Sequence, residues 1–408
     1  MANVLYISYT GLLDPLGQSQ VLQYVLGLAR DHRITLLSFE KPHLVANKPE
    51  LNALTERCRS VGVDWHRLTY HNRPGIPATI YDIVVGMRKA TALARAHRIQ
   101  TVHCRSYIAG IIGLTVKRNT GACFIFDMRG FWPDERVDGG VWKREWMRYR
   151  AFKWIERRLF LGADHVVSLT QAGKREIEAF DYLKEHLPPI SVIPTCTNIQ
   201  LFRPVTPDPQ PTGAFTLGYL GSAGSWYMFE EIAKTVSLLF RLRPSSRFLV
   251  INKDEHVAIR KKLVDAGVDL NRVEIISAPF VEVSKHIARM NAGIFFYRPT
   301  WSKTATSPTR LGEFLACGKP VLANTGVGDV ERTLRETSTG IGIDDFEKDT
   351  LLSGLKSLIE ISEEPDIVDR CVSAAERRFS LDHGVAEYSR IYRRLSGSDS
   401  ESAKGIPA

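Results

Sequence analysis

The most chemically suggestive stretch of the chain spans residues 298–328. Within it, Ser307 and Pro308 predict a helix start, because serine can cap free N–H groups and proline suits the first helical position. A helix N-terminus beside basic side chains is a favourable anion site. Three basic residues lie close to this predicted start: Arg298, Lys303 and Arg310.

A carboxylate, Glu313, follows one turn into the predicted helix. Its position suits a sugar hydroxyl, so anion and hydroxyl contacts together indicate a nucleotide-type ligand. Gly318 predicts the end of this helix, and Pro320–Ala323 reads as a short buried strand. The ordinary alternative is an αβ turn whose glutamate is merely solvated.

The composition of the 408 residues is that of a globular protein with two or three domains, at 44% hydrophobic and 24% charged. The net charge of +9, with a pI near 9.2, favours an anionic partner: nucleic acid, nucleotide or an acidic membrane surface. Simple solubility is the competing explanation of this charge.

The six cysteines form no C-x-x-C pair, and we expect buried thiols in a reducing cytoplasm. The N-terminus lacks the pattern of a secretion signal, and no apolar run approaches about 18 residues. We therefore expect a cytoplasmic protein without a membrane-spanning helix, and contact with the inner face of the plasma membrane stays open.

Strands and helices alternate along the chain, which predicts an α/β fold with parallel sheets. A first series of strands is predicted at Val4–Ser8, Ile34–Phe39, Thr101–His103, Ala122–Asp127, Asp164–Leu169 and Ser191–Ile193. A loop over residues 10–20 is expected to follow the first strand. A helix is predicted at 79–97 and another near 107–117.

A proline-rich run over residues 203–213 reads as a linker before a second series. Its strands are predicted at Thr216–Leu220, Arg247–Ile251, Val273–Ile276, Gly293–Tyr297 and Pro320–Ala323. Its helices are predicted at 227–242, 255–266, 281–290, 308–317 and 349–361. A last helix is expected near 387–395, followed by a disordered tail.

Two doubly wound domains in series have a natural ligand site, since loops at the carboxyl ends of both sheets can face each other across a cleft. Five residues lie in loops that follow predicted strands and are expected to line this cleft: Gly17, Arg105, Arg129, Gly221 and Ser307.

The chain resembles a family 4 glycosyltransferase of the GT-B fold, with two Rossmann-like domains facing across a cleft. The resemblance covers nearly the whole chain, and its main carrier is SPTRLGEFLACGKPVLAN, residues 307–324. Three further segments support it: ADHVVSLTQAGKREI (163–177), SVIPTCTNIQLFRP (191–204) and LGYLGSAGSWYMFEEIAK (217–234).

The resemblance implies a retaining, metal-independent hexosyltransferase that moves a sugar from an NDP-sugar to a glycan or polyprenyl-linked acceptor, in bacterial surface polysaccharide assembly. No cofactor and no nucleic acid are expected. Helix dipoles and basic side chains can stabilise the leaving diphosphate without a metal. It also implies an acceptor-side domain at 1–200, completed by a helix at about 383–396, a donor domain at 201–382, and a tail at 397–408.

Several donor-binding roles are implied residue by residue. Glu313 matches the second glutamate of the family's E-x7-E motif, which binds the donor ribose, whereas the first glutamate is replaced by Ala305. Thr309 and Arg310 stand where backbone N–H groups hold the diphosphate. Gly17 matches a glycine loop whose backbone approaches phosphate closely.

The loop after the first donor-domain strand, which begins at Gly221, lacks the family's Arg and Lys. Another group must therefore neutralise the diphosphate. The predicted donor-side residues for this task are Arg298, Lys303 and Arg310, with solvated surface charges as the alternative.

The acceptor side is predicted at two strand ends. His103 and Arg105 stand where the family often shows H-x-H, and Arg105, which stays protonated, suits a phosphate rather than a proton. His103 alternatively packs within its strand. Asp127 and Arg129 are predicted to orient the acceptor, while the leaving phosphate helps to remove its proton.

Residues 141–160 are rich in Lys, Arg and Trp, and predict an amphipathic helix that could lie on an anionic membrane. Such a helix would suit a lipid-anchored acceptor. The alternative is a core helix with a solvated basic face.

Two alternatives to the main functional hypothesis remain open at this stage. One is a GT-B enzyme that acts on a soluble sugar, of the sucrose or trehalose type. The other is a non-catalytic protein of the same fold that binds anions, nucleotides or nucleic acid, which Ala305 and the loop without Arg or Lys motivate.

Overall fold

The computed structural model describes residues 1–205, 214–224 and 226–397. The chain divides into two compact units: Met1–Pro194 together with the segment from Leu381 onward, and Thr195–Ser380. We call these the first and the second unit. Part of the proline-rich run (206–213) and the predicted tail from residue 398 lie outside the described residues.

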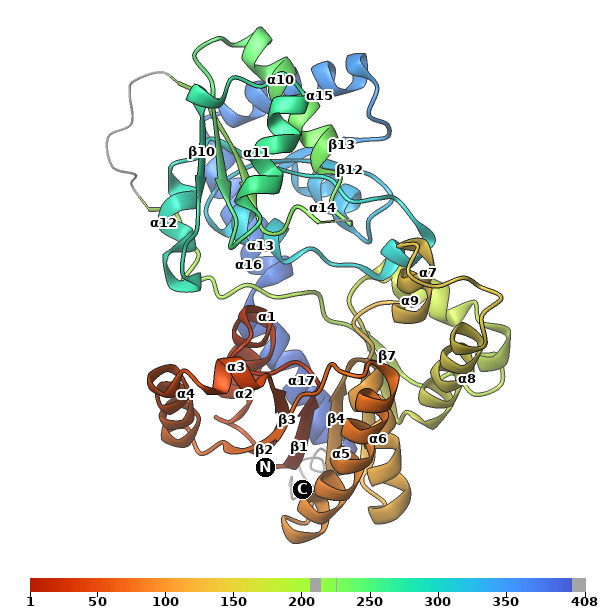
Figure 1. Ribbon diagram of the computed structural model, residues 1–408. Helices are drawn as coiled ribbons and strands as arrows, with labels where there is room; N and C mark the ends of the chain where they lie inside the picture. The colour runs from red at the N-terminus through yellow and green to blue at the C-terminus, as the bar shows by residue number, and fades with distance from the viewer. Residues whose placement is uncertain (206–213, 225, 398–408) are drawn as a thin grey trace, which may run out of the picture. The chain divides into compact units, whose positions relative to one another are not determined.

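The first unit contains a seven-stranded parallel sheet in the order β3-β2-β1-β4-β5-β6-β7 (Figure 1). Its central strands are almost wholly buried, as expected for a parallel sheet covered on both faces, although β4 (TVHCR) also buries His103 and Arg105. The strands are β1 Asn3–Ser8, β2 Arg33–Glu40, β3 Asp64–Thr69, β4 Thr101–Arg105, β5 Cys123–Asp127, β6 His165–Ser168 and β7 Ile190–Val192.

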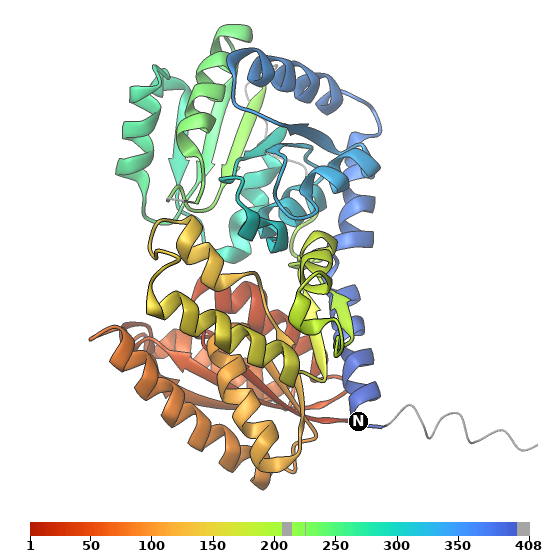
Figure 2. The same cartoon turned by 90° about the vertical axis from the view of Figure 1, so that its right-hand side faces the viewer.

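Helices cover this sheet, with α5 and α6 side by side. The last helix, α17, is drawn in blue in Figure 2 and packs against α2 of the same unit. The helices are α1 Pro15–Gly17, α2 Gln23–Leu28, α3 Pro42–Val45, α4 Lys48–Ser60, α5 Ile76–Ala96, α6 Ser106–Thr120, α7 Trp132–Asp138, α8 Met147–Gly162, α9 Gln171–Glu178 and α17 Leu381–Leu395.

The second unit contains a six-stranded parallel sheet in the order β10-β9-β8-β11-β12-β13. Its strands are β8 Thr216–Leu220, β9 Arg247–Ile251, β10 Val273–Ile276, β11 Ala292–Phe295, β12 Val321–Asn324 and β13 Gly340–Ile343. Its helices are α10 Phe229–Leu242, α11 His256–Asp265, α12 Val283–Ala288, α13 Thr309–Ala316, α14 Val330–Thr337, α15 Lys348–Ser362 and α16 Ile367–Phe379.

Each sheet has one point at which the chain reverses its direction of growth. The first sheet grows from β1 through β2 to β3 and restarts on the other side with β4; the second does the same between β8 and β11. At such a switch point the loops leaving neighbouring strands diverge and open a crevice at the carboxyl edge. The fold therefore places one candidate crevice in each unit.

All the predicted strands are present, but the structure corrects three local predictions. Residues 10–20 are not a loop throughout, because the chain becomes helical at Pro15 and Gly17 lies in that helix. The basic stretch 141–160 is not one helix, since α8 begins only at Met147. The helix predicted from Ser307 begins at Thr309, with Pro308 at the capping position.

The six cysteines are free thiols, and all except the half-buried Cys123 are buried, as predicted. Among the described residues, no helix has both the length and the apolar character that crossing a bilayer requires.

Candidate active site

Arg310 is the central group at the switch point of the second unit. Its side chain extends from the first turn of α13, and the residue is only 6% exposed. Four aromatic rings surround the guanidinium, with centroids 4.4 Å (Tyr227), 5.1 Å (Tyr219), 5.6 Å (Tyr297) and 6.0 Å (Phe295) from its carbon. Such rings stabilise a cation through their negative faces.

No carboxylate forms an ion pair with Arg310 in the described part of the chain, and its buried Nη1 lacks a hydrogen-bond partner. The rings hold the cation in place without neutralising it. A buried arginine in this state is suited to bind an anion.

Gly221 explains how the guanidinium reaches the edge of the sheet. This residue follows β8 directly and has φ +108°, a conformation that side chains other than glycine rarely adopt. A Cβ atom here would lie 2.6 Å from Nη2 of Arg310. Arg310 therefore supplies a positive charge at the loop whose own sequence contains no Arg or Lys.

Glu313 lies one turn further along α13 and is 8% exposed. Its carboxylate has no hydrogen-bond or ion-pair partner among the described residues. Burial raises its pKa to about 7, although the positive charge of Arg310 opposes this shift. A buried acceptor without a partner suits the hydroxyl of a ligand.

The start of α13 differs from the sequence prediction in what Ser307 does. Its hydroxyl does not cap the helix but lies 3.0 Å from Oγ1 of Thr195, whose N–H donates to it over 3.2 Å. The first-turn N–H groups, including that of Thr309, consequently receive no side-chain cap. Ala305 is fully buried.

The two other predicted basic residues differ in burial. Lys303 is 5% exposed, with its Nζ 4.0 Å from the ring centroid of Trp226. Arg298 is exposed, and its described contacts do not include the aromatic cluster around Arg310. The structure therefore gathers Gly221, Arg310 and Glu313 near one another, and among the described residues no hydrogen bond, ion pair or ring contact joins the Arg298 side chain to them.

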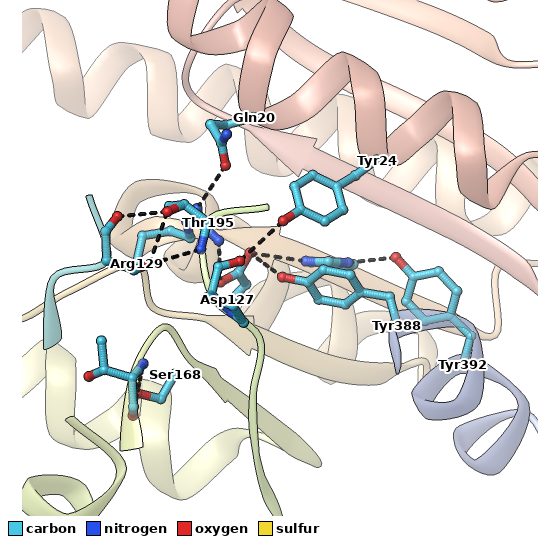
Figure 3. A network of polar contacts seen from close by, with 12 residues as sticks. Gln20, Tyr24, Asp127, Arg129, Ser168, Thr195, Tyr388 and Tyr392 are labelled. Atoms are coloured by element: carbon cyan, nitrogen blue, oxygen red, sulfur yellow. Dashed lines mark hydrogen bonds and ion pairs between the residues drawn. The ribbon is translucent and has the colours of Figure 1, made fainter. Parts of the chain in front are cut away.

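In the first unit, Asp127 is the centre of a buried polar network (Figure 3). Tyr388 donates a 3.1 Å hydrogen bond to Oδ2, and Nε2 of His103 lies 3.5 Å from the same oxygen. Nδ1 of His103 lies 2.6 Å from the hydroxyl of Tyr392. Burial works to raise the pKa of Asp127, but Arg129, His103 and Arg105 together hold it below its usual value.

This network gives Asp127 a structural role, because the i, i+4 tyrosines Tyr388 and Tyr392 dock α17 against β4 and β5. Its predicted orienting role in catalysis stays a prediction. Neither tyrosine was predicted from the sequence, although their spacing in EYSRIYRRL was the available signal.

Arg129 connects this network to the N-terminal helix. Its Nη1 lies 3.6 Å from Oδ1 of Asp127, and its Nη2 donates to Oε1 of Gln20 over 3.5 Å. Gly17, one turn before Gln20, packs so tightly that a Cβ would lie 1.8 Å from the carbonyl oxygen of Gly11. Packing inside the unit thus already requires glycine at position 17.

Backbone strain marks the ends of two neighbouring strands of this sheet. Arg129, just after β5, has φ +62°, and Ser106, just after β4, has φ +72°. Neither is glycine, and such conformations cluster at functional sites. Arg105 immediately precedes Ser106 and pairs in register with Ser8 of β1, so it lies at the switch point of the first sheet.

A separate cluster of possible metal ligands was not foreseen from the sequence, which predicted no metal. Asp64 and His66 on β3 and His97 after α5 bring their ligand atoms within 4.8 Å of one another. His66 is already 2.9 Å from Asp64, and His97 lies 3.0 Å from Thr35. These mutual contacts account for the cluster without an ion.

Comparison with known proteins gives a family for part of the chain. Residues 17–194, which lie in the first unit, match the family described as Glycosyl transferase 4-like domain. No curated protein sequence matches the chain at a significant level.

Solved structures match over nearly the full length. Sucrose-phosphate synthase from Thermosynechococcus elongatus has a TM-score of 0.73 at 14% identity, covering 98% of this chain and 100% of that one. A glycosyltransferase from Rickettsia africae gives 0.70 at 14%, covering 97% and 98%. Anabaena HepE in complex with UDP and glucose gives 0.66 at 13%, covering 96% and 99%.

At these low identities the structural likeness shows the fold, which is GT-B. The predicted α/β fold class is thereby confirmed, and so is the resemblance to GT4-like glycosyltransferases, with the family match confined to residues 17–194.

Proposed function

We propose that this glycosyltransferase of the GT4-like type transfers a sugar from an NDP-sugar to an acceptor hydroxyl, with retention at the anomeric carbon. The observation that carries the proposal is the arrangement at the second switch point. Arg310, which we call the caged arginine because aromatic rings surround it, lies there beside Gly221 without an acid partner. The buried carboxylate of Glu313, also without a partner, follows one turn later.

This arrangement matches the two ends of a nucleotide donor. Arg310 and the uncapped N–H groups of α13 would hold the diphosphate, and Glu313 would accept hydrogen bonds from the ribose. Lys303 is a further donor-side candidate. Among the similar structures, HepE was solved with UDP and glucose, which supports a donor of this class.

The proposed transfer breaks the bond between the anomeric carbon and the phosphate oxygen and forms the new glycosidic bond on the same face. The acceptor proton passes to the leaving phosphate. Arg310 stabilises the charge that develops on the diphosphate, so this scheme requires no metal ion and no protein nucleophile.

For the acceptor we propose a glycan or a lipid-linked glycan, in surface polysaccharide assembly. The main alternative is a soluble sugar acceptor, which the similarity in fold to sucrose-phosphate synthase favours. We also propose contact with an anionic membrane through the region around α8, where Met147 is 77% and Trp154 59% exposed.

A thermal-shift panel of nucleoside diphosphates and NDP-sugars, run with and without EDTA, tests the donor assignment. We expect one nucleotide class to raise Tm, with the same shift when EDTA is present. If Tm did not respond to any of these nucleotides, the donor assignment would be overturned. If EDTA abolished the shift, the metal-independent scheme would be overturned.

A further inference from the structure

The first unit contains a cavity of about 1210 Å³ beside its own switch point. It extends from Tyr9, which follows β1, and Arg105, the last residue of β4, to the first turns of α5 and to α8. Small-molecule sites commonly occupy about 300–1,000 Å³. The cavity is therefore large enough for a ligand with an extended chain.

Where β4 ends, the cavity is lined by an arginine that forms no ion pair with a carboxylate of the described residues. Arg105 is 7% exposed, its Nε is buried without a hydrogen-bond partner, and no carboxylate in the described residues forms an ion pair with it. The nearby carboxylate of Asp127 is engaged by Arg129, His103 and Tyr388. A buried charge in this position is costly until an anion arrives.

Two more arginines line the cavity and stack on its aromatic wall. The guanidinium of Arg136 lies 5.1 Å from the ring of Trp132. That of Arg148 lies 5.4 Å from the ring of Trp142 and 3.8 Å from the ring of Trp146, which is not part of the lining. The rings of Trp132 and Trp142 are themselves 5.2 Å apart. The lining also includes Lys41 and Asp14, but these two neutralise each other at 2.5 Å.

The same cavity also has an apolar part of its lining. Ile76 and Ile80, on the first turns of α5, are 59% and 55% exposed. Ile83, Ile108 and Ile111 continue the same apolar surface from α5 and α6. Exposed apolar side chains gathered along a cavity favour an apolar ligand surface.

We propose that this cavity binds the acceptor as an amphiphile, in which a phosphate or diphosphate is joined to an apolar chain. The phosphate lies at Arg105, and the chain runs along Ile76, Ile80 and Ile83. This inference rests on the proposed transferase function, because it assigns the acceptor to the first unit.

Titration calorimetry on the full chain tests this assignment with farnesyl phosphate, below its critical micelle concentration, against inorganic phosphate and farnesol. We expect farnesyl phosphate to bind at least about tenfold more tightly than either fragment, because only it engages both ends of the cavity. Equal affinity for inorganic phosphate, or for farnesol, would overturn the amphiphile assignment.

Variants separate the two ends of the site. Arg105→Gln should weaken farnesyl phosphate by about tenfold or more, as expected for a hydrogen-bonded charged pair. Ile80→Asn should also weaken it, whereas Val84→Asn, exposed on the same helix but outside the cavity, should leave it unchanged. Farnesyl phosphate binding that survives both Arg105→Gln and Ile80→Asn would overturn the location.

Two further titrations complete the test. One distinguishes an acceptor from a membrane phospholipid, and the other separates failure of this inference from failure of the proposed function. Lysophosphatidic acid that bound more tightly than farnesyl phosphate would overturn the acceptor assignment in favour of a membrane phospholipid. UDP is titrated into the same preparation: UDP binding without farnesyl phosphate binding overturns this inference alone. The reverse result supports the amphiphile site and counts against the donor function.

Discussion

Buried arginines have different surroundings in the two units. In the first unit, Asp127 lies between Arg129 and His103, and tyrosines of α17 complete the network. In the second unit, Arg310 has aromatic rings in place of a carboxylate. The Asp127 network pairs Arg129 within the protein but leaves Arg105 without an ion pair among the described residues, and Arg310 likewise has none.

The comparison also separates two kinds of carboxylate. Asp127 is held ionised by its cationic neighbours, whereas burial favours the protonated form of Glu313. Asp127 thus contributes to the fold, and Glu313 lacks a partner in the protein. We infer that ligand contacts belong to the unpaired groups: Arg310 and Glu313 in the second unit, and Arg105 in the first.

Among these substitutions, we expect Arg310→Gln to have the largest effect, which is a loss of catalytic rate. Removing a preorganised cation from a developing negative charge typically costs about 10²–10³ in kcat. Sugar transfer measured with the nucleotide class identified by thermal shift provides the test. Arg298→Gln, on an exposed loop of the same unit, should lower kcat far less. An equal loss of kcat in the two variants would contradict the assignment of a particular catalytic role to Arg310.

Asp127→Asn should act on stability. Loss of the carboxylate leaves the buried Arg129 unpaired, and breaking a buried pair typically costs about 3–5 kcal/mol of unfolding free energy. Tyr388→Phe removes only one hydrogen bond to that charge, for about 1.5–3 kcal/mol. Urea unfolding measures both changes; an Asp127→Asn protein as stable as wild type would contradict the structural role.

Glu313→Gln should alter how stability depends on pH. The folded pKa of about 7 lies above the unfolded value near 4.5, so the folded state binds the proton more tightly. Stability is then lost as pH rises from about 4.5 to about 7, by up to about 3 kcal/mol, and is constant above. Urea unfolding at pH 5 and pH 8 should show this loss in wild type and in exposed Glu360→Gln, but not in Glu313→Gln.

The smallest effect per residue is expected at the surface near α8. Replacing Lys143, Arg144 and Arg150 with Gln should weaken the free energy of binding to anionic vesicles by about 1 kcal/mol per residue. The fraction of protein that floats with the vesicles should fall accordingly. These residues are exposed. The matched triple Arg57, Arg59 and Arg88, also exposed in the first unit, should have no such effect when changed to Gln. Equal behaviour of the two triples would rule out this membrane face.

The strand pattern could be predicted from the sequence because buried parallel strands are short apolar runs between turn signals. The edge strands β3 and β13 were missed: the residues DWHRLT of β3 are polar and none of them is buried, and β13 is the short, glycine-rich GIGI. The switch in strand order could not be predicted from the sequence, because it depends on pairing between distant segments.

Parts of the site followed from local spacing, and parts did not. Gly221, Arg310 and Glu313 lie within two short segments that the sequence analysis singled out. The aromatic rings around Arg310 come from β8, β11 and the loops that follow them, so spacing within the 298–328 segment did not reveal them. The sequence could not show that Arg105 lacks an ion pair, because this follows from the pairing of Asp127 with Arg129 in the folded structure.

The most direct test of the account is titration calorimetry of UDP, or of the nucleoside diphosphate that raises Tm most, into wild type, Arg310→Gln and Arg105→Gln. We predict that Arg310→Gln weakens binding by about tenfold or more, and that Arg105→Gln changes it by less than about twofold. Unchanged binding in Arg310→Gln, or an equal loss in Arg105→Gln, would contradict the assignment of the donor to the caged arginine of the second unit.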